Sequence, residues 1–165
     1  MRVSARAEYG VRAMVQLARV CGSGPVPLSH LAEKERMPLD FLEQLMVALR
    51  QKGLVHSARG VHGGYFLAMD PGRITVGDIM TAVEGPFVPM QCLDVSVNHQ
   101  DTCAMGIVVC ECATRDVWAL LQEKVVETLN SVTLADLCRD RRVPLRPTYR
   151  ETIETVLAAC EPIPD

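Results

Sequence analysis

Aromatic residues are scarce in this chain of 165 residues, where they make up 4% of the total and include a single tryptophan. Aliphatic side chains must therefore fill most of the core. Long apolar runs are missing too, because no stretch approaches the roughly 18 residues that a membrane-spanning helix needs. The first residues contain no apolar signal core. We therefore expect a cytoplasmic protein.

Recognisable catalytic machinery is also missing. We find no nucleophile–base pair and no phosphate-binding loop, so we expect a protein that is not an enzyme. We find no internal repeat and no low-complexity segment either. With 48% hydrophobic and 22% charged residues, the composition is that of a globular protein with one ordinary domain, or a small domain with an appendage.

Charge is distributed unevenly along the chain. Residues 1–75 carry ten Lys or Arg against six Asp or Glu, whereas residues 76–165 carry seven against fourteen. The front part is therefore the one suited to face phosphates, although a balance of +4 can also arise by chance.

The front part contains three predicted helices. The first follows its N-cap Ser4 and ends near Val20. A second, short helix has Ser29 as its N-cap, and a break at Met37 and Pro38 separates it from a third over 38–52. The third helix has a polar outer face and a buried face made of Leu42, Leu45, Met46 and Leu49. The second and third helices form a helix-turn-helix pattern, which any helical hairpin also resembles.

A β-hairpin is expected directly after these helices. Residues 54–58 and 65–68 are its arms, and three glycines between them supply the turn. A hairpin in this place makes the pattern a winged helix, so the predicted fold is mainly α with a small β-hairpin wing. Arg59 lies near the wing tip, where a cation can enter the DNA minor groove, unless it is only a solvated loop arginine.

The rear part is predicted to be helical again. A capping box at 75–78 opens a helix through Val83, and a long helix runs from Thr114 toward Asn130. The long helix has an apolar stripe that indicates a partner helix from a second subunit, or else packing onto its own domain. A short helix ends near Arg139. Another helix is expected at 149–160, in a tail (139–165) to which we assign no function.

Cysteines gather in the segment 90–118, which lacks a steady period and is expected to be mostly loop. It holds four of the seven cysteines, namely Cys92, Cys103, Cys110 and Cys112. An odd total in a reducing compartment disfavours disulfides. Thiolates in a loop suit zinc or an iron–sulfur cluster, and the wide gaps between them favour the cluster over the tight knuckles of zinc sites. A zinc-bound or thiol–disulfide switch remains the alternative.

Four segments together resemble the Rrf2 family of bacterial transcription regulators, including its IscR-like and NsrR-like members. They are residues 1–14, 41–45, 59–68 and 112–118. The resemblance spans roughly residues 1–138. It implies a homodimer formed through the long helix, a winged helix that binds a palindromic operator in double-stranded DNA, and an iron–sulfur cluster (2Fe–2S or 4Fe–4S) on three cysteines.

The resemblance also implies the cluster ligands. Cys92, Cys103 and Cys112 match the family cysteines, while Cys110 is extra, so which three ligate, or whether all four do, stays open. Some members have a histidine three residues after the last cysteine, but this chain has Arg115, which stays protonated. Other members use a carboxylate from the first helix of the partner subunit. Glu8 occupies that place here, unless it is simply a carboxylate favoured by the helix dipole. His99 is a weaker candidate.

The same resemblance gives the expected DNA contacts and organisation. The predicted DNA-binding residues are Asp40, Glu43, Gln44, Arg50 and Arg59. We expect a DNA-binding domain over 1–85, a cluster-binding loop over 86–113, and a dimerisation helix with the following short helix over 114–138. The predicted function is a transcriptional regulator whose operator affinity depends on the cluster, and through it on redox state, nitric oxide or iron status.

Overall fold

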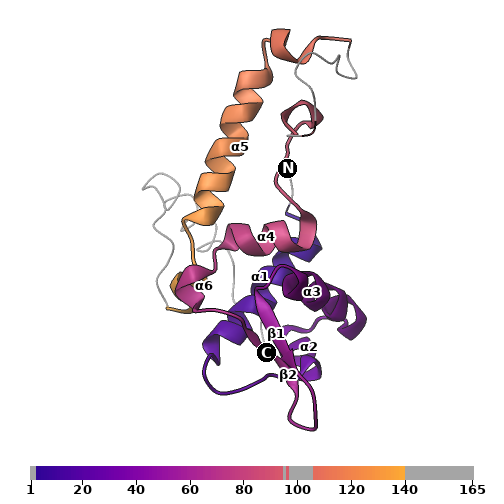
Figure 1. The fold of residues 1–165 in the computed structure, drawn as a ribbon, viewed down its shortest axis with the longest axis vertical. Coiled ribbons are helices and arrows are strands. Elements are labelled where there is room, and N and C mark those ends of the chain that lie inside the picture. Colours follow the sequence, from indigo (N-terminus) through magenta and orange to yellow (C-terminus); the bar gives the residue numbers. More distant parts are fainter. Residues whose placement is uncertain (1–2, 95, 97–105, 140–165) are drawn as a thin grey trace, which may run out of the picture.

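The computed structural model describes residues 3–94, 96 and 106–139 and is mainly helical, with a two-stranded antiparallel hairpin (Figure 1). The elements in chain order are α1 (Ala5–Arg19), α2 (Leu28–Glu35), α3 (Leu39–Gln51), β1 (Val55–Ala58), β2 (Gly64–Leu67), η1 (Pro71–Arg73), α4 (Val76–Glu84), η2 (Gln91–Leu93), η3 (Val109–Glu111), α5 (Arg115–Asn130) and α6 (Leu134–Cys138). Within this described part, no helix combines the length and apolar character needed to cross a membrane. The helix that we predict at 149–160 lies outside the described residues.

Helix α1 begins where the sequence predicts because Ser4 caps it. The Ser4 hydroxyl oxygen accepts a hydrogen bond from the backbone N–H of Ala7 at 3.2 Å. Farther along, α1 approaches α4 so closely that a β-carbon on Gly10 would lie 3.2 Å from a methyl of Val83. A glycine at this position therefore permits the close packing of the two helices.

Helices α2 and α3 form the predicted helix-turn-helix. Helix α2 ends at Glu35, and Arg36 turns the chain with a left-handed φ of 52°. The prediction of Ser29 as N-cap is wrong. The helix begins at Leu28, directly after Pro27, and no side chain caps it. The ring of Pro27 fixes a φ of −59°, which already suits the entry to a helix.

An aliphatic core holds these helices together, as the low aromatic content predicts. The four predicted residues of α3 are fully buried: Leu42, Leu45, Met46 and Leu49. The core continues into α1, the hairpin, the link between η1 and α4, α4 itself and α6, where the fully buried large side chains are Met14, Val55, Ile74, Ile79 and Leu134. Helix α3 is thus packed against the core on one face and exposed on the other.

The hairpin packs against the loop that precedes α2. Its register pairs Val55 with Leu67 and Ala58 with Gly64. Val26 forms an isolated bridge to Tyr65, exchanging two backbone hydrogen bonds of 2.9 Å. A β-carbon on Gly64 would collide with the carbonyl of Val26, so glycine is required where the loop and the hairpin meet.

Two capping boxes bring the rear of the chain back to the core. Thr75 and Asp78 cap α4 reciprocally, and Thr133 and Asp136 cap α6 in the same way. An antiparallel bridge links Thr75 to Thr133. Helix α6 therefore lies beside α1 and η1 and contributes Leu134 to the core.

Helix α5 leaves this body (Figure 1). Its C-terminal end packs on α4, where Asn130 lies against Gly77, and the helix also contacts η2, but none of its residues is buried. In the predicted stripe, Trp118 and Leu121 are exposed, as are Val117 and Leu120 beside them, whereas Val125 and Leu129 are half-buried. The large apolar side chains open to solvent are Val117, Trp118, Leu120, Leu121 and Val126.

Candidate nucleic-acid interface and thiol site

The outer face of α3 presents polar side chains to solvent. Asp40, Glu43 and Gln44 are all exposed, on the side opposite the buried leucines. A helix of this kind, held from behind and polar in front, has the form needed to enter a DNA major groove. The structure therefore brings together three of the five predicted DNA-binding residues on the front half of one helix face.

The two predicted arginines lie at the far end of α3 and at the wing. Arg50 is exposed, and its Nη1 donates a hydrogen bond to the hydroxyl of Ser57 on β1 at 3.5 Å. Arg59 directly follows β1 and is also exposed. Strand β1 thus contacts Arg50 at the end of α3 and leads directly into Arg59.

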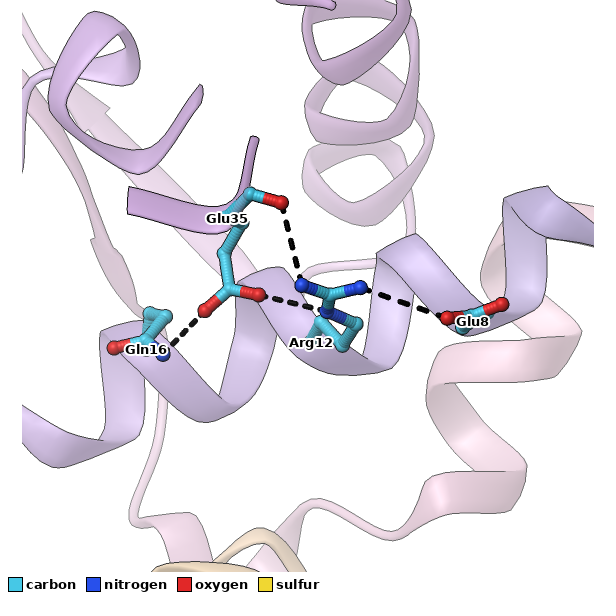
Figure 2. Close-up of polar contacts among 4 residues, drawn as sticks. All are labelled: Glu8, Arg12, Gln16 and Glu35. Carbon is cyan, nitrogen blue, oxygen red and sulfur yellow. Dashed lines mark hydrogen bonds and ion pairs between the residues drawn. The ribbon is translucent and has the colours of Figure 1, made fainter. Parts of the chain in front are cut away.

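A buried carboxylate joins α1 to the end of α2 (Figure 2). Glu35 is 9% exposed, and its Oε2 accepts a hydrogen bond from Arg12 Nε at 2.7 Å. Arg12 also donates to the backbone carbonyl of Glu35 at 3.2 Å, while Gln16 donates to the other carboxylate oxygen. These bonds fix the last residue of α2, one position before the turn into α3.

Arg12 connects this buried carboxylate to an exposed one. Its Nη1 lies 3.5 Å from Glu8 Oε1, and the Glu8 side chain is 59% exposed. The hydrogen bond from Arg12 to Glu35, together with the charges of Glu35 and Glu8, raises the pKa of Arg12 above its ordinary value. Glu8, the predicted ligand on α1, is therefore accessible but engaged with Arg12.

The described thiols of the cysteine segment lie at the ends of short helical turns. Cys92 is in η2, and Cys112 caps η3 just before α5; both are free and half-buried. Cys103, His99 and the side chain of Cys110 lie outside the described residues. Across 3–94, 96 and 106–139, no group of three or more Cys, His, Asp or Glu side chains is arranged to hold a metal ion.

Cys112 has surroundings that favour its thiolate. Its Sγ lies 3.4 Å from the hydroxyl of Thr114. This hydrogen bond, with further help from the backbone N–H of Thr114 and from the N–H and charge of Arg115, lowers the pKa of Cys112. Arg115 therefore favours the thiolate form of Cys112. By contrast, burial raises the pKa of Cys138, which lies in α6.

Sequence reasoning missed Arg12, Glu35 and Thr114. The spacing of Glu8 and Arg12 by four residues indicates their surface pair. Nothing local indicates Glu35, because it lies 23 positions from Arg12 and meets it only through the packing of α2 on α1.

Comparisons with known proteins agree with this arrangement. The family described as "Rrf2: Iron-dependent Transcriptional regulator" matches residues 3–140. The chain is 37% identical over 137 residues to the HTH-type transcriptional regulator CymR of Bacillus subtilis, covering 83% of this chain and 89% of that protein. It is 36% identical over 143 residues to the HTH-type transcriptional regulator IscR of Cronobacter sakazakii, covering 87% and 83%.

Solved structures give the same result. A CymR structure described as that of the global cysteine regulator of B. subtilis superposes with a TM-score of 0.67 at 36% identity, covering 84% of this chain and 96% of that one. The T. potens IscR structure gives a TM-score of 0.65 at 35% identity, covering 90% and 96%. The predicted winged-helix fold is confirmed by these matches, and the relatives are transcriptional regulators rather than enzymes.

Proposed function

This chain belongs to the Rrf2 family of DNA-binding transcriptional regulators, and from this premise we propose that an iron–sulfur cluster on its cysteine segment controls its affinity for an operator. The observation that carries the proposal is the thiol of Cys112. This thiol is half-buried and forms no disulfide, and its lowered pKa favours the thiolate. It lies where the loop joins α5. Thiolates are the form in which cysteines bind iron.

Helix α3 is proposed to read the operator in the major groove. Glu43 can accept a hydrogen bond from cytosine N4, and Gln44 can pair with adenine through its amide. Asp40, in the first turn, contacts the DNA beside them. Arg50 neutralises a phosphate, and Arg59 reaches the minor groove from the wing. The exposure of all five side chains supports these roles.

A second copy of the chain is proposed to cover α5. Exposed aliphatic and tryptophan side chains in a row along a projecting helix match what a symmetric helix pair buries. Pairing through α5 would hold two copies of α3 at a fixed separation, and a palindromic operator has two half-sites at a fixed separation. Operator affinity then depends on how the two DNA-binding units are held.

Thiolates from Cys92, Cys103 and Cys112 are proposed to hold the cluster, with Cys110 as a further candidate and Glu8 of the partner subunit as the non-cysteine ligand. Soft thiolate donors of this kind fit an iron–sulfur cluster, and the described cysteines Cys92 and Cys112 are not bound in disulfides. When bound, the cluster supplies a centre that oxidants and nitric oxide can alter. Residues of the chain would transmit that change to the DNA-binding helices.

Glu8 and Arg12 are proposed to link the cluster to the operator contacts. Ligation of the cluster by Glu8 would draw negative charge away from its ion pair with Arg12, in which Arg12 Nη1 lies 3.5 Å from Glu8 Oε1, and would weaken that pair. Arg12 keeps its bonds to Glu35 at the end of α2. Engagement or release of Glu8 therefore acts on the same pair of helices that positions α3.

An alternative is a regulator that responds through zinc or a thiol–disulfide exchange on the same cysteines. The similarity to CymR, described as a global cysteine regulator, supports this alternative. A thiol with a lowered pKa, as at Cys112, also suits disulfide exchange.

Anaerobic purification followed by iron, acid-labile sulfide and zinc analysis distinguishes the two. The proposal predicts iron and sulfide with visible absorbance, both lost in Cys112→Ala. Both should be retained in Cys21→Ala, which removes an exposed cysteine outside the segment. Zinc without sulfide, or colourless protein that cannot be reconstituted, favours the alternative.

A further inference from the structure

A cavity of about 490 Å³ lies beneath the wing, at some distance in sequence from the cysteine segment. Its walls are the end of α1 (Leu17 and Val20), the loop up to Val26, and strand β2 (Tyr65 and Phe66). We call it the wing cavity. Its volume lies within the roughly 300–1,000 Å³ typical of small-molecule sites.

The lining of the wing cavity is apolar and uncharged. None of the residues that form it, all in the described part of the chain, is Asp, Glu, Lys, Arg or His. The side-chain polar groups are the thiol of Cys21 and the hydroxyl of Tyr65. Moving a charged molecule into such surroundings without a partner is costly, so the cavity suits an uncharged, mainly apolar ligand.

The walls are held in a way that keeps the cavity open. Leu17 and Leu67 are anchored in the core, with 2% and 9% of their surface exposed. Val26 is held to Tyr65 by two backbone hydrogen bonds of 2.9 Å, so the loop cannot close onto the hairpin independently. Phe66 remains 38% exposed, which leaves an aromatic surface for a ligand to cover.

The rim of the cavity is unobstructed. Gly22 and Gly24 have φ values of +88° and +105°, and nothing lies within 4 Å of where their β-carbons would be. Cys21, beside them, is exposed. The mouth of the cavity therefore has room for a ligand to enter between fixed walls.

The wing cavity is connected to the proposed DNA contacts through the hairpin. Tyr65 in its wall pairs with Ser57, which holds the guanidinium of Arg50. Ala58, which also lines the cavity, directly precedes Arg59. A molecule that moves or stiffens β2 therefore acts on both cations.

We propose that the wing cavity is a binding site for an uncharged, mainly apolar small molecule, and that its occupation changes operator affinity by moving the wing. The binding site stands on the cavity alone, whereas the effect on DNA rests on the proposed function. Coupling of two sites through one hairpin is reciprocal, so operator DNA must also alter the affinity for the ligand.

Binding is tested with N-phenyl-1-naphthylamine, an uncharged apolar probe whose fluorescence rises in apolar surroundings. We expect saturable binding that weakens at least about tenfold in Cys21→Trp, where the indole fills the mouth of the cavity. Ser23→Trp is the matched control, because it adds the same side chain to the same loop at a position that does not line the cavity. Equal binding by all three proteins overturns the site.

A second measurement uses the unaltered chain and does not depend on a variant folding. Bound probe should slow alkylation of Cys21 by iodoacetamide about fivefold or more, while Cys138, which lines no part of the cavity, reacts at an unchanged rate. Mass spectrometry of the two peptides reads both rates. Unprotected Cys21 in the presence of saturating probe overturns the assignment.

Operator affinity measured with and without the probe tests the coupling. We expect a change of about fivefold or more for the unaltered chain and for Ser23→Trp, but none for Cys21→Trp. Probe binding at the cavity with no change in operator affinity overturns the coupling. Failure of the probe-free chain to bind any operator would instead refute the proposed function, while probe fluorescence still reports on the cavity.

Discussion

Arg12 Nε lies 2.7 Å from Glu35 Oε2, and this contact fixes the last residue of α2 against α1. Glu35 is buried, whereas the Arg12 side chain is 45% exposed. Removal of the guanidinium leaves a buried carboxylate with Gln16 as its remaining side-chain partner. The contact therefore matters more for the position of α3 than an ordinary surface ion pair would.

Arg12→Ala is expected to lower the free energy of unfolding by about 1–2 kcal/mol. This is less than the ~3–5 kcal/mol of a fully buried pair, because solvent screens the exposed side of Arg12. Glu8→Ala removes the exposed end of the same network and should change stability by about 0.5 kcal/mol or less. Urea denaturation of the two variants measures the difference. Equal effects would mean that Glu35 does not depend on Arg12.

In the metal-free protein, Cys112 is expected to react with iodoacetamide at lower pH than an ordinary cysteine. The hydrogen bond from Thr114 lowers the pKa of Cys112, and only the thiolate is alkylated. Cys138 should react at higher pH, because burial raises its pKa. Thr114→Ala should move the alkylation midpoint of Cys112 upward and leave that of Cys138 unchanged. Peptide-resolved alkylation across a pH series checks both.

Gln44→Ala should weaken operator binding by about 1–3 kcal/mol and relax base preference at one position of each half-site. Arg50→Ala should weaken binding to all sequences. It should also reduce the slope of log K against log salt concentration by about one, because one phosphate contact is lost. Gln51→Ala, at the exposed end of the same helix, is the control. Fluorescence anisotropy at several salt concentrations measures all three. A uniform loss in Gln44→Ala would remove it from the base-reading residues.

Leu121→Lys should break or weaken the dimer, because it places a charge in the apolar stripe of α5. Glu123→Lys introduces the same side chain on the side of the helix away from Trp118 and Leu121 and should leave the dimer intact. Analytical ultracentrifugation over a concentration series gives the result. A monomeric unaltered chain would refute the role of α5 as a dimer helix.

Much of the fold follows from local signals in the sequence. Ser4, Thr75 and Thr133 each lie just before a helix and cap its N-terminus, in α1, α4 and α6 respectively. The buried face of α3 follows the period of a helix. Ser29 is an exception, since the φ of Pro27 starts the helix before a side-chain cap is needed. Local signals of this kind act within a few residues.

The polar contacts between elements could not be predicted in the same way. Glu35 looks like any surface glutamate until α2 packs on α1 and brings Arg12 to it. The wing cavity likewise depends on a bridge between Val26 and Tyr65, which are far apart in the sequence. The spacing of the cysteines predicted a cluster, but only the resemblance to a family predicted which cysteines bind it and added Glu8, and the role of all of them as ligands stays a prediction.

The most direct test of the account compares operator affinity of cluster-loaded and metal-free protein under anaerobic conditions at one salt concentration. We predict dissociation constants that differ by about fivefold or more, and a difference that shrinks in Glu8→Ala. Equal dissociation constants for the two forms, with the cluster shown to be present in one of them, would contradict the account.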